Sequence, residues 1–366
     1  MAEEKTVLQI TDVIKKLENN DFSIYFFVLD TKGNPNGALT YIYEHAKILR
    51  DNGINAIILT EKNDYTGVDD WLGYEYSTIP HVSIESQTLK VGPQDFVVIP
   101  ELFANVMEQT KNMPCKRIVF CQSYDYILEI LNLGTKWIDY GIKDCVTTTE
   151  KQKAIVKELF PTVNTEIVPI GIPEYFKPST KPQKPIVSLY CRDPRDTAKI
   201  AKTFYLKYPQ FKWITFRDMK GLPRKMFAES LADSCLAVWV DQIAGFGTFP
   251  IEAMKSGVPV IGRVPNVIPE WMEQIIDGNP SLKQNGIWTY DTIRIPDLIA
   301  TFLRLWLEDN IPNDVYDNMH EYDNVYTMDT MKQSVMDYYK KQIENRKIEF
   351  TTLITQQQQQ QQPTNA

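Results

Sequence analysis

The stretch DQIAGFGTFPIEAMKSGVPVIG, Asp241 to Gly262, joins a strand end, a glycine turn, a helix and a second strand. The apolar run CLAVWV precedes it and predicts a buried strand that ends near Asp241. Gly245 and Gly247 predict a turn that exposes backbone N–H groups at the start of a helix, where an anion is favoured. Glu252 would lie in the first turns of that helix. Its carboxylate would either accept the two hydroxyls of a ribose or face solvent near the helix start.

The same alternation of apolar runs and helical patterns continues in both directions along the chain. Runs such as INAIILT, DFVVIP and RIVFCQ predict buried strands, and ALTYIYEHAKILRDNG predicts an amphipathic helix that ends near Gly53. Strands that alternate with helices favour parallel sheets with helices on both faces. We therefore expect an α/β protein of two tandem doubly wound domains that face each other across a cleft, with ligands at the carboxyl ends of the strands.

A proline-rich segment marks the boundary between the two series. The sequence IGIPEYFKPSTKPQKP predicts a linker over 170–185, between a first domain at 1–169 and a second domain at 186–326. A last helix is expected over 327–347. The tail at 348–366 contains a run of seven glutamines, and we expect it to be of low complexity and disordered.

Composition limits the function classes. The net charge of −8 argues against a chain that coats nucleic acid through clustered lysines and arginines, although a local basic groove stays open. Three scattered histidines and five cysteines without a C-x-x-C pair argue against a zinc site, and we expect reduced, mostly buried thiols. No apolar run reaches the length of a bilayer span, and the acidic start lacks an apolar signal core. We expect a cytoplasmic protein.

Two further segments are candidates for binding an anion. In DTKGNPNGALTY a strand is followed by a loop to Gly37 and a helix, so that Gly37 allows backbone to approach a phosphate or a sugar, although many such loops are plain turns. In SLYCRDPRDTAK, Arg192 follows a strand and Lys199 lies in the next segment. This pair either clamps a diphosphate and stabilises its charge on departure, or forms surface salt bridges with Asp193 and Asp196.

In combination these segments resemble the retaining nucleotide-sugar glycosyltransferases of the GT-B fold, over about Phe22 to Gln342. GALTYIYEHAKILRDNGINAIILT is similar to the first glycine loop and helix of that family, and VPIGIPEYFKP to its interdomain signature. CRDPRDTAK resembles its Arg…Lys phosphate clamp, and GFGTFPIEAMKSGVPVIG its donor motif. VIPEWM and NGIWTY occupy the places of two later motifs. The resemblance implies two Rossmann-like domains, and a final helix that crosses back to the first, acceptor-side domain.

The resemblance also implies roles for individual residues. Glu252 would hold the ribose as the second glutamate of the Glu-x7-Glu motif, and Arg192 and Lys199 would bind the diphosphate and act in catalysis. The other implied donor contacts are Gly37, Gly245, Phe246, Gly247 and Thr248. This fold class works without a divalent metal, so we expect neither a metal nor another cofactor besides the donor as co-substrate.

The sequence departs from the family pattern at two places. The first glutamate of the donor motif, which contacts sugar hydroxyls in the family, is replaced by Ala244. The histidine that the family often carries near the donor sugar is absent from FCQSYD, where Gln122, Ser123 and Asp125 are candidates to contact the sugar or the acceptor.

We therefore expect a glycosyltransferase that moves a hexosyl or pentosyl group from a nucleoside diphosphate sugar to a hydroxyl, with retention of the anomeric configuration. The acceptor is left open as a glycan, a lipid-linked sugar or, as in some phage enzymes of this fold, a hydroxymethylated pyrimidine in DNA. A sugar-nucleotide epimerase is disfavoured by the few histidines. Ala244 leaves a third reading, a protein that binds nucleotide sugars without catalysis.

Overall fold

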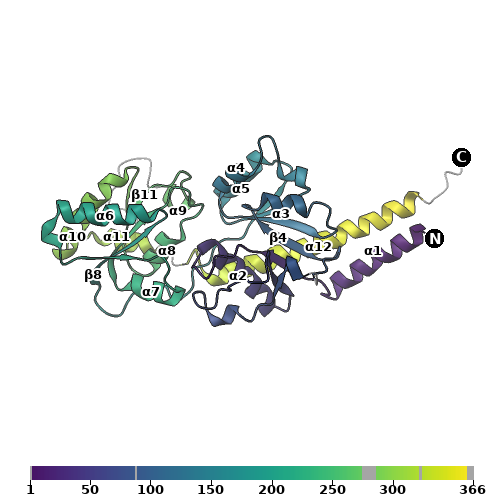
Figure 1. The fold of residues 1–366 in the computed structure, drawn as a ribbon, viewed down its shortest axis with the longest axis horizontal. Coiled ribbons are helices and arrows are strands. Elements are labelled where there is room, and N and C mark those ends of the chain that lie inside the picture. The colour runs from purple at the N-terminus through teal and green to yellow at the C-terminus, as the bar shows by residue number, and fades with distance from the viewer. Residues whose placement is uncertain (1, 87–88, 274–285, 321–323, 361–366) are drawn as a thin grey trace.

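The computed structural model describes residues 2–86, 89–273, 286–320 and 324–360. Two parallel sheets form the centres of its two halves (Figure 1). The first sheet has the order β3-β2-β1-β4-β5-β6-β7 and the second the order β12-β11-β10-β8-β9. Every pair of neighbouring strands is parallel, as the alternating pattern predicts.

The strands of the first sheet are short and mostly buried. They are β1 (Ile24–Phe27), β2 (Ala56–Thr60), β3 (His81–Ser83), β4 (Phe96–Pro100), β5 (Lys116–Cys121), β6 (Asp144–Thr147) and β7 (Asn164–Ile167). Those of the second sheet are β8 (Lys184–Cys191), β9 (Thr215–Asp218), β10 (Ser234–Val240), β11 (Val260–Arg263) and β12 (Gly286–Thr289).

Helices cover the faces of both sheets. In the first half they are α1 (Ala2–Glu18), α2 (Gly37–Asp51), α3 (Ala104–Gln109), α4 (Tyr124–Ile130) and α5 (Glu150–Leu159). In the second half they are α6 (Pro194–Lys207), α7 (Arg224–Ala232), α8 (Thr248–Lys255), α9 (Glu270–Glu273), α10 (Ile295–Leu307) and α11 (Asn313–His320). The last helix, α12 (Met328–Gln360), belongs to the first half.

Helix α2 illustrates how local sequence sets the elements at the cleft. The Asn36 side chain accepts a hydrogen bond from the Leu39 N–H at 3.0 Å and so caps the helix start. The predicted apolar stripe, from Leu39 to Leu49, is buried against the sheet. Gly53, with φ of +79°, follows the helix end, as helix-terminating glycines do.

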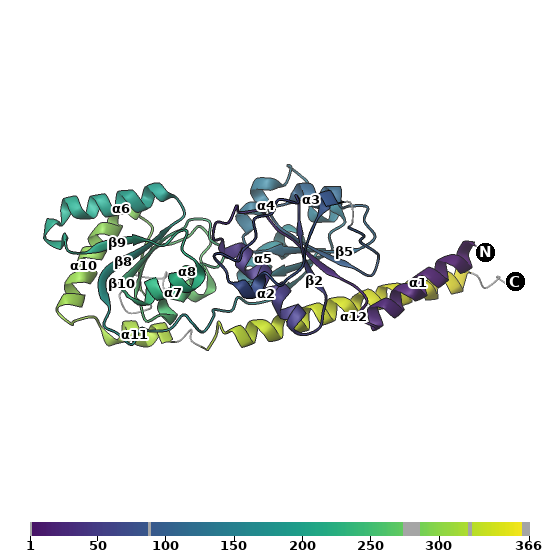
Figure 2. The same cartoon turned by 60° about the horizontal axis from the view of Figure 1, so that its bottom comes forward.

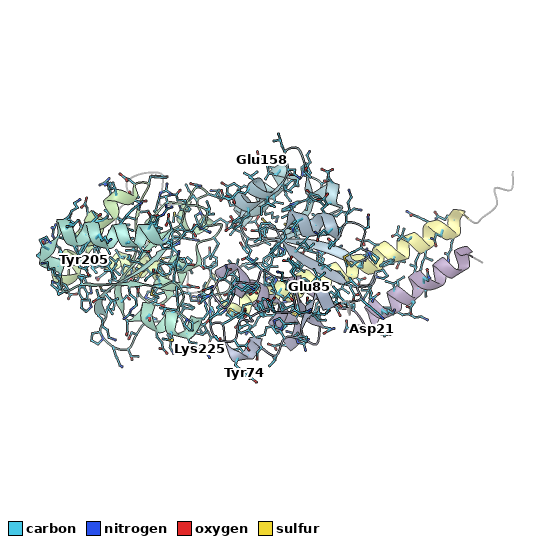
Figure 3. All side chains as sticks on the ribbon, viewed as in Figure 1. Asp21, Tyr74, Glu85, Glu158, Tyr205 and Lys225 are labelled. Carbon is cyan, nitrogen blue, oxygen red and sulfur yellow. The ribbon has the colours of Figure 1, made fainter. Side chains whose placement is uncertain are left out.

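One apolar cluster extends across both halves. Buried residues of the first sheet, the linker, the second sheet and α12 form one continuous cluster, and Phe176 of the linker lies within it. The Arg224 N–H donates to the Trp71 carbonyl at 2.7 Å and links α7 to the first half. Tyr74 and Lys225, close to this contact, lie on either side of the junction in Figure 3.

Helix α12 returns to the first half and packs against α1 and α2. Arg346 donates to the carbonyls of Pro93 and Pro114, and Lys341 forms an ion pair with Glu166 at 3.0 Å. Figures 1 and 2 both show α1 beside the last part of α12.

The expected disorder of the tail is wrong for residues 348–360, because α12 continues to Gln360. Phe350 of this segment is buried. Its helix packs against α1, which was not predicted from the sequence. Glutamine is itself compatible with a helix. The remainder of the tail lies outside the described residues.

The five cysteines are all buried and none forms a disulfide, as predicted. No helix of the described residues has the combination of length and apolarity that a membrane span requires.

Candidate active site

A cavity of about 580 Å³, here called the main cleft, lies at the carboxyl ends of both sheets. Its walls come from the loop before α2, from the ends of β4 and β5, and from the ends of β8 and β10 with the start of α8. The predicted site residues that line it are Gly37, Gln122, Ser123, Arg192, Gly245, Phe246, Gly247 and Thr248. The site is therefore assembled from segments far apart in the sequence, as expected for facing α/β domains.

The glycine turn before α8 is required by its surroundings. Gly247 precedes the helix with φ of +76°, and a Cβ there would lie 2.8 Å from the Trp239 ring. A Cβ on Gly245 would lie 2.0 Å from the Gln122 carbonyl oxygen of the first half. Only glycine fits both positions, and the turn brings the free N–H groups at the start of α8 to the cleft.

Arg192 follows β8 directly and is partly exposed in the main cleft. Its Nε donates to Asp241 Oδ1 at 2.6 Å and its Nη1 to the Tyr126 hydroxyl at 3.1 Å. Burial lowers the pKa of Arg192, but Asp241 and Tyr126 outweigh it and hold that pKa above its ordinary value. The guanidinium is therefore a permanent cation at the rim, fixed in orientation by one residue of each half.

The second predicted cation does not reach the cleft. Lys199 lies on α6 with 73% of its side chain exposed and forms a 3.8 Å ion pair with Asp196, which was the alternative reading of its spacing. Lys220, two residues after β9, occupies the expected place instead. Its ammonium donates to the Arg192 carbonyl, and its side chain lines both the main cleft and the adjoining cavity.

Glu252 lines that adjoining cavity of about 260 Å³, here called the inner pocket. Its carboxylate is almost fully buried and pairs with Arg224 Nη2 at 2.6 Å. The Arg224 guanidinium lies 4.9 Å from the ring centre of Phe176 and 5.6 Å from that of Phe227. Glu252 is thus held by a buried, ring-stacked arginine that the motif did not reveal.

Ala244 places only a methyl group in the main cleft, where the family pattern has a carboxylate. Three other acidic residues line the same cavity: Glu101 after β4, Glu129 on α4 and Asp241 after β10. Asp241 Oδ1 accepts from Arg192 and from the Ile243 N–H at 3.2 Å, which fixes its carboxylate beside the cation.

Glu101 is the most deeply buried acid in the cleft. Its Oε1 accepts a 2.7 Å hydrogen bond from the Ser123 N–H, and burial raises its pKa to about 7. Gln122 and Ser123 form the loop between β5 and α4. This loop connects the two halves, because the Ser123 hydroxyl donates to the Ile243 carbonyl at 3.1 Å. Gln122 donates to the Ala38 carbonyl at 3.0 Å and so binds the loop to the start of α2.

Asp125, the third candidate in the segment FCQSYD, does not line the main cleft. It lies in the first turn of α4, and its neighbour Tyr126 contributes to the lining instead. Burial raises the pKa of Asp125, and its carboxylate interacts with Tyr124. Asp125 is therefore a weaker candidate for a sugar contact than Glu101 or Asp241.

Of the four residues that could not be assigned from the sequence, two had a simple positional signal and two had none. Glu101 and Asp241 are each the first polar residue after a buried strand, in DFVVIPE and CLAVWVD. Lys220 and Arg224 flank the Gly221–Pro223 turn after β9, outside any recognisable motif. Among the described residues no group of three or more His, Cys, Asp or Glu is arranged to hold a metal ion.

Comparisons with known proteins bear on this site. No protein-family profile matches the chain. An alpha-1,6-glucosyltransferase of Actinobacillus pleuropneumoniae serotype 7 (strain AP76) is 25% identical over 255 residues, which cover 67% of this chain and 74% of the relative.

Solved structures match most of the chain at low sequence identity. Sucrose-phosphate synthase from Thermosynechococcus elongatus has a TM-score of 0.62 at 11% identity, with 88% of this chain and 99% of that chain covered. The pneumococcal O-GlcNAc transferase GtfA, in complex with UDP and GlcNAc, has a TM-score of 0.58 at 11% identity, with 89% and 99% covered. A glycosyltransferase from Rickettsia africae gives 0.59 at 14% identity, with 87% and 98% covered.

These structures have the two-domain arrangement predicted from the alternating strands and helices, and the predicted GT-B fold is confirmed. The fold, the glycine turn and helix placed at the cleft, and the sequence relative together support glycosyltransferase activity on a GT-B fold.

Proposed function

We propose that the protein transfers a sugar from a nucleoside diphosphate sugar to a hydroxyl group, with retention of the anomeric configuration. The observation that carries the proposal is the arrangement of two connected cavities around two cations. The main cleft and the inner pocket share Lys220 and the start of α8, and Arg192 lies at the rim of the main cleft.

The donor would extend across both cavities. The nucleoside enters the inner pocket, where the Glu252 carboxylate, oriented by Arg224, accepts the ribose hydroxyls. The diphosphate lies against Arg192, Lys220 and the N–H groups that begin α8. The sugar then projects into the main cleft toward Gln122 and Glu101.

Catalysis would rest on position and charge. The bond between the anomeric carbon and the phosphate oxygen breaks, the acceptor oxygen attacks the same face, and the departing diphosphate takes the acceptor proton. Arg192 and Lys220 stabilise the negative charge that grows on the diphosphate, an interaction stronger in the transition state than in the ground state. We propose that no divalent metal takes part.

The sugar would be recognised without the usual glutamate. Asp241 is fixed beside Arg192 and faces the same cavity as Ala244, so we assign the contact with sugar hydroxyls to Asp241. The named relative acts as a glucosyltransferase and one structural neighbour holds UDP, so UDP-glucose is the first donor to test.

The test is a panel of nucleoside diphosphate sugars incubated with candidate acceptors, scored by product mass. Proton NMR of the product then reads the configuration at the anomeric carbon. We expect transfer with retention and equal rates with and without EDTA. An inverted product, or loss of activity in EDTA, would contradict the respective part of the proposal. Donor binding without hydrolysis or transfer would identify a non-catalytic nucleotide-sugar binder.

A further inference from the structure

A groove leads from the main cleft across the carboxyl edge of the first sheet. Leu29 and Phe103 line both the main cleft and a neighbouring cavity of about 200 Å³. Thr60, Lys62 and Tyr65 line both that cavity and a third one of about 360 Å³. Because they share these residues, the two outer cavities adjoin, and together they are here called the side groove, over the ends of β1 and β2 to β3.

The outer part of the side groove has one rigid aromatic wall. The Tyr65 ring stacks on His81 with centroids 5.4 Å apart and planes at 29°. The Tyr43 hydroxyl donates to the Tyr65 hydroxyl at 2.9 Å and lies 2.7 Å from His81 Nε2. Tyr43 is itself buried, so the half-buried Tyr65 ring and the exposed His81 ring are anchored to the core and are held in place at little cost in side-chain entropy.

The rest of the outer lining is polar and carries both signs of charge. It includes the amide of Asn63, the hydroxyls of Ser77 and Ser83, the Lys62 ammonium and the Asp69 carboxylate. An aromatic face surrounded by short-range donors and acceptors suits a sugar ring, whose C–H face is apolar and whose edge carries hydroxyls.

The same lining disfavours the other acceptor classes. An apolar lipid chain would find mainly polar groups in the outer cavity. The phosphates of DNA would meet the carboxylates of Asp30, Glu61 and Asp69 along the groove.

We propose that the side groove binds the carbohydrate chain of the acceptor, so that the protein glycosylates an oligosaccharide and not an isolated sugar, a lipid chain or a DNA base. This inference rests on the proposed function. The reacting hydroxyl lies in the main cleft, and the sugars behind it follow the groove to the Tyr65–His81 stack.

The experiment uses two series of acceptors, α-1,6-linked and α-1,4-linked glucose, each from glucose to the pentasaccharide. The specificity constant kcat/KM for transfer is measured with the full-length protein and compared with the rate of donor hydrolysis in water. In the wild type we expect kcat/KM to rise about tenfold or more with length in one series, equivalent to about 1.4 kcal/mol of added binding.

Three variants locate the effect. Tyr65→Ala should abolish the rise with length, whereas Tyr65→Phe, which keeps the ring, should retain most of it. Tyr74→Ala is the matched control, because Tyr74 is 79% exposed and lies outside the lining of all three cavities. Donor hydrolysis should be unchanged in all three variants.

Three results would overturn the inference and leave the proposed function standing. The first is a kcat/KM that does not change with acceptor length in either series while the donor is still hydrolysed. The second is a rise of kcat/KM with length that survives in Tyr65→Ala. The third is equal use of a lipid-linked monosaccharide or of hydroxymethylated DNA as the acceptor. Failure of the wild type to cleave any donor would instead overturn the proposed function, and the inference with it.

Discussion

At the residue scale, the two lysines near Arg192 differ in what surrounds them. Lys220 lines both the main cleft and the inner pocket, whereas Lys199 faces solvent beside Asp196. Lys220→Ala should lower kcat/KM for transfer by about 10²-fold, the usual cost of losing one transition-state charge donor. Lys199→Ala should change it less than about twofold. Steady-state kinetics of the two variants give a matched comparison. A larger loss of kcat/KM in Lys199→Ala than in Lys220→Ala would restore the motif-based assignment of Lys199.

The buried ion pair of Arg224 and Glu252 makes a prediction about stability. Removal of one partner leaves a buried charge uncompensated, so Arg224→Met should cost about 3–5 kcal/mol of the free energy of unfolding. Replacing both, Arg224→Met with Glu252→Leu, should recover much of that loss, because an apolar pair of similar volume needs no compensation. Urea unfolding of the two single variants and the double variant gives the coupling directly; additive losses would show that the pair is not coupled.

Glu101 makes a prediction about pH. Its pKa is about 7 in the folded protein against 4.5 for the free group, so the folded state binds the proton more tightly. Stability should therefore fall as pH rises from about 4.5 to 7, by on the order of 3 kcal/mol from this group. Glu101→Gln keeps an acceptor for the Ser123 N–H and should lack this fall. The free energy of unfolding is measured against pH by urea unfolding of both proteins. The same pH dependence in both would show that Glu101 is not the group responsible.

At the element scale, the helices and strands that the sequence predicted are those with a local signal. Buried apolar runs such as RIVFCQ and CLAVWV are strands, and the stripe from Leu39 to Leu49 is a buried helix face. Strand β3 was missed because His81–Ser83 is short and only one of its residues is buried. The extension of α12 was missed because its partner α1 lies at the other end of the sequence, where no local pattern shows the contact.

The pairing of α1 with α12 can be tested by one core substitution. Leu17 of α1 is 1% exposed, and Leu17→Ala should reduce the free energy of unfolding by about 2–5 kcal/mol through the lost burial and the cavity left behind. Leu353→Ala, at a position 45% exposed on α12, should change it by less than about 0.5 kcal/mol. Equal, small effects in thermal or urea unfolding would mean that α1 does not pack as described.

At the scale of the whole molecule, the parts of the site that could be predicted are those within one motif. Gly245 to Glu252 are found at the cleft because one turn and one helix position them. The partners in the site come from elsewhere: Arg192, directly after β8, meets Asp241 and, from the opposite half, Tyr126, and Glu252 meets Arg224 of α7. Such pairs depend on how the two sheets are placed, which a single motif does not encode.

Arg192 lies at the meeting point of the two halves, where we propose that it stabilises the departing diphosphate. The most direct test is single-turnover cleavage of a nucleoside diphosphate sugar, with release of the nucleoside diphosphate followed in the wild type and in Arg192→Ala. Arg195→Ala is the control, because Arg195 is 82% exposed and pairs with Asp193 on the surface. We predict a rate about 10²–10³-fold lower in Arg192→Ala and an unchanged rate in Arg195→Ala. A normal rate in Arg192→Ala would show that Arg192 does not stabilise the departing diphosphate.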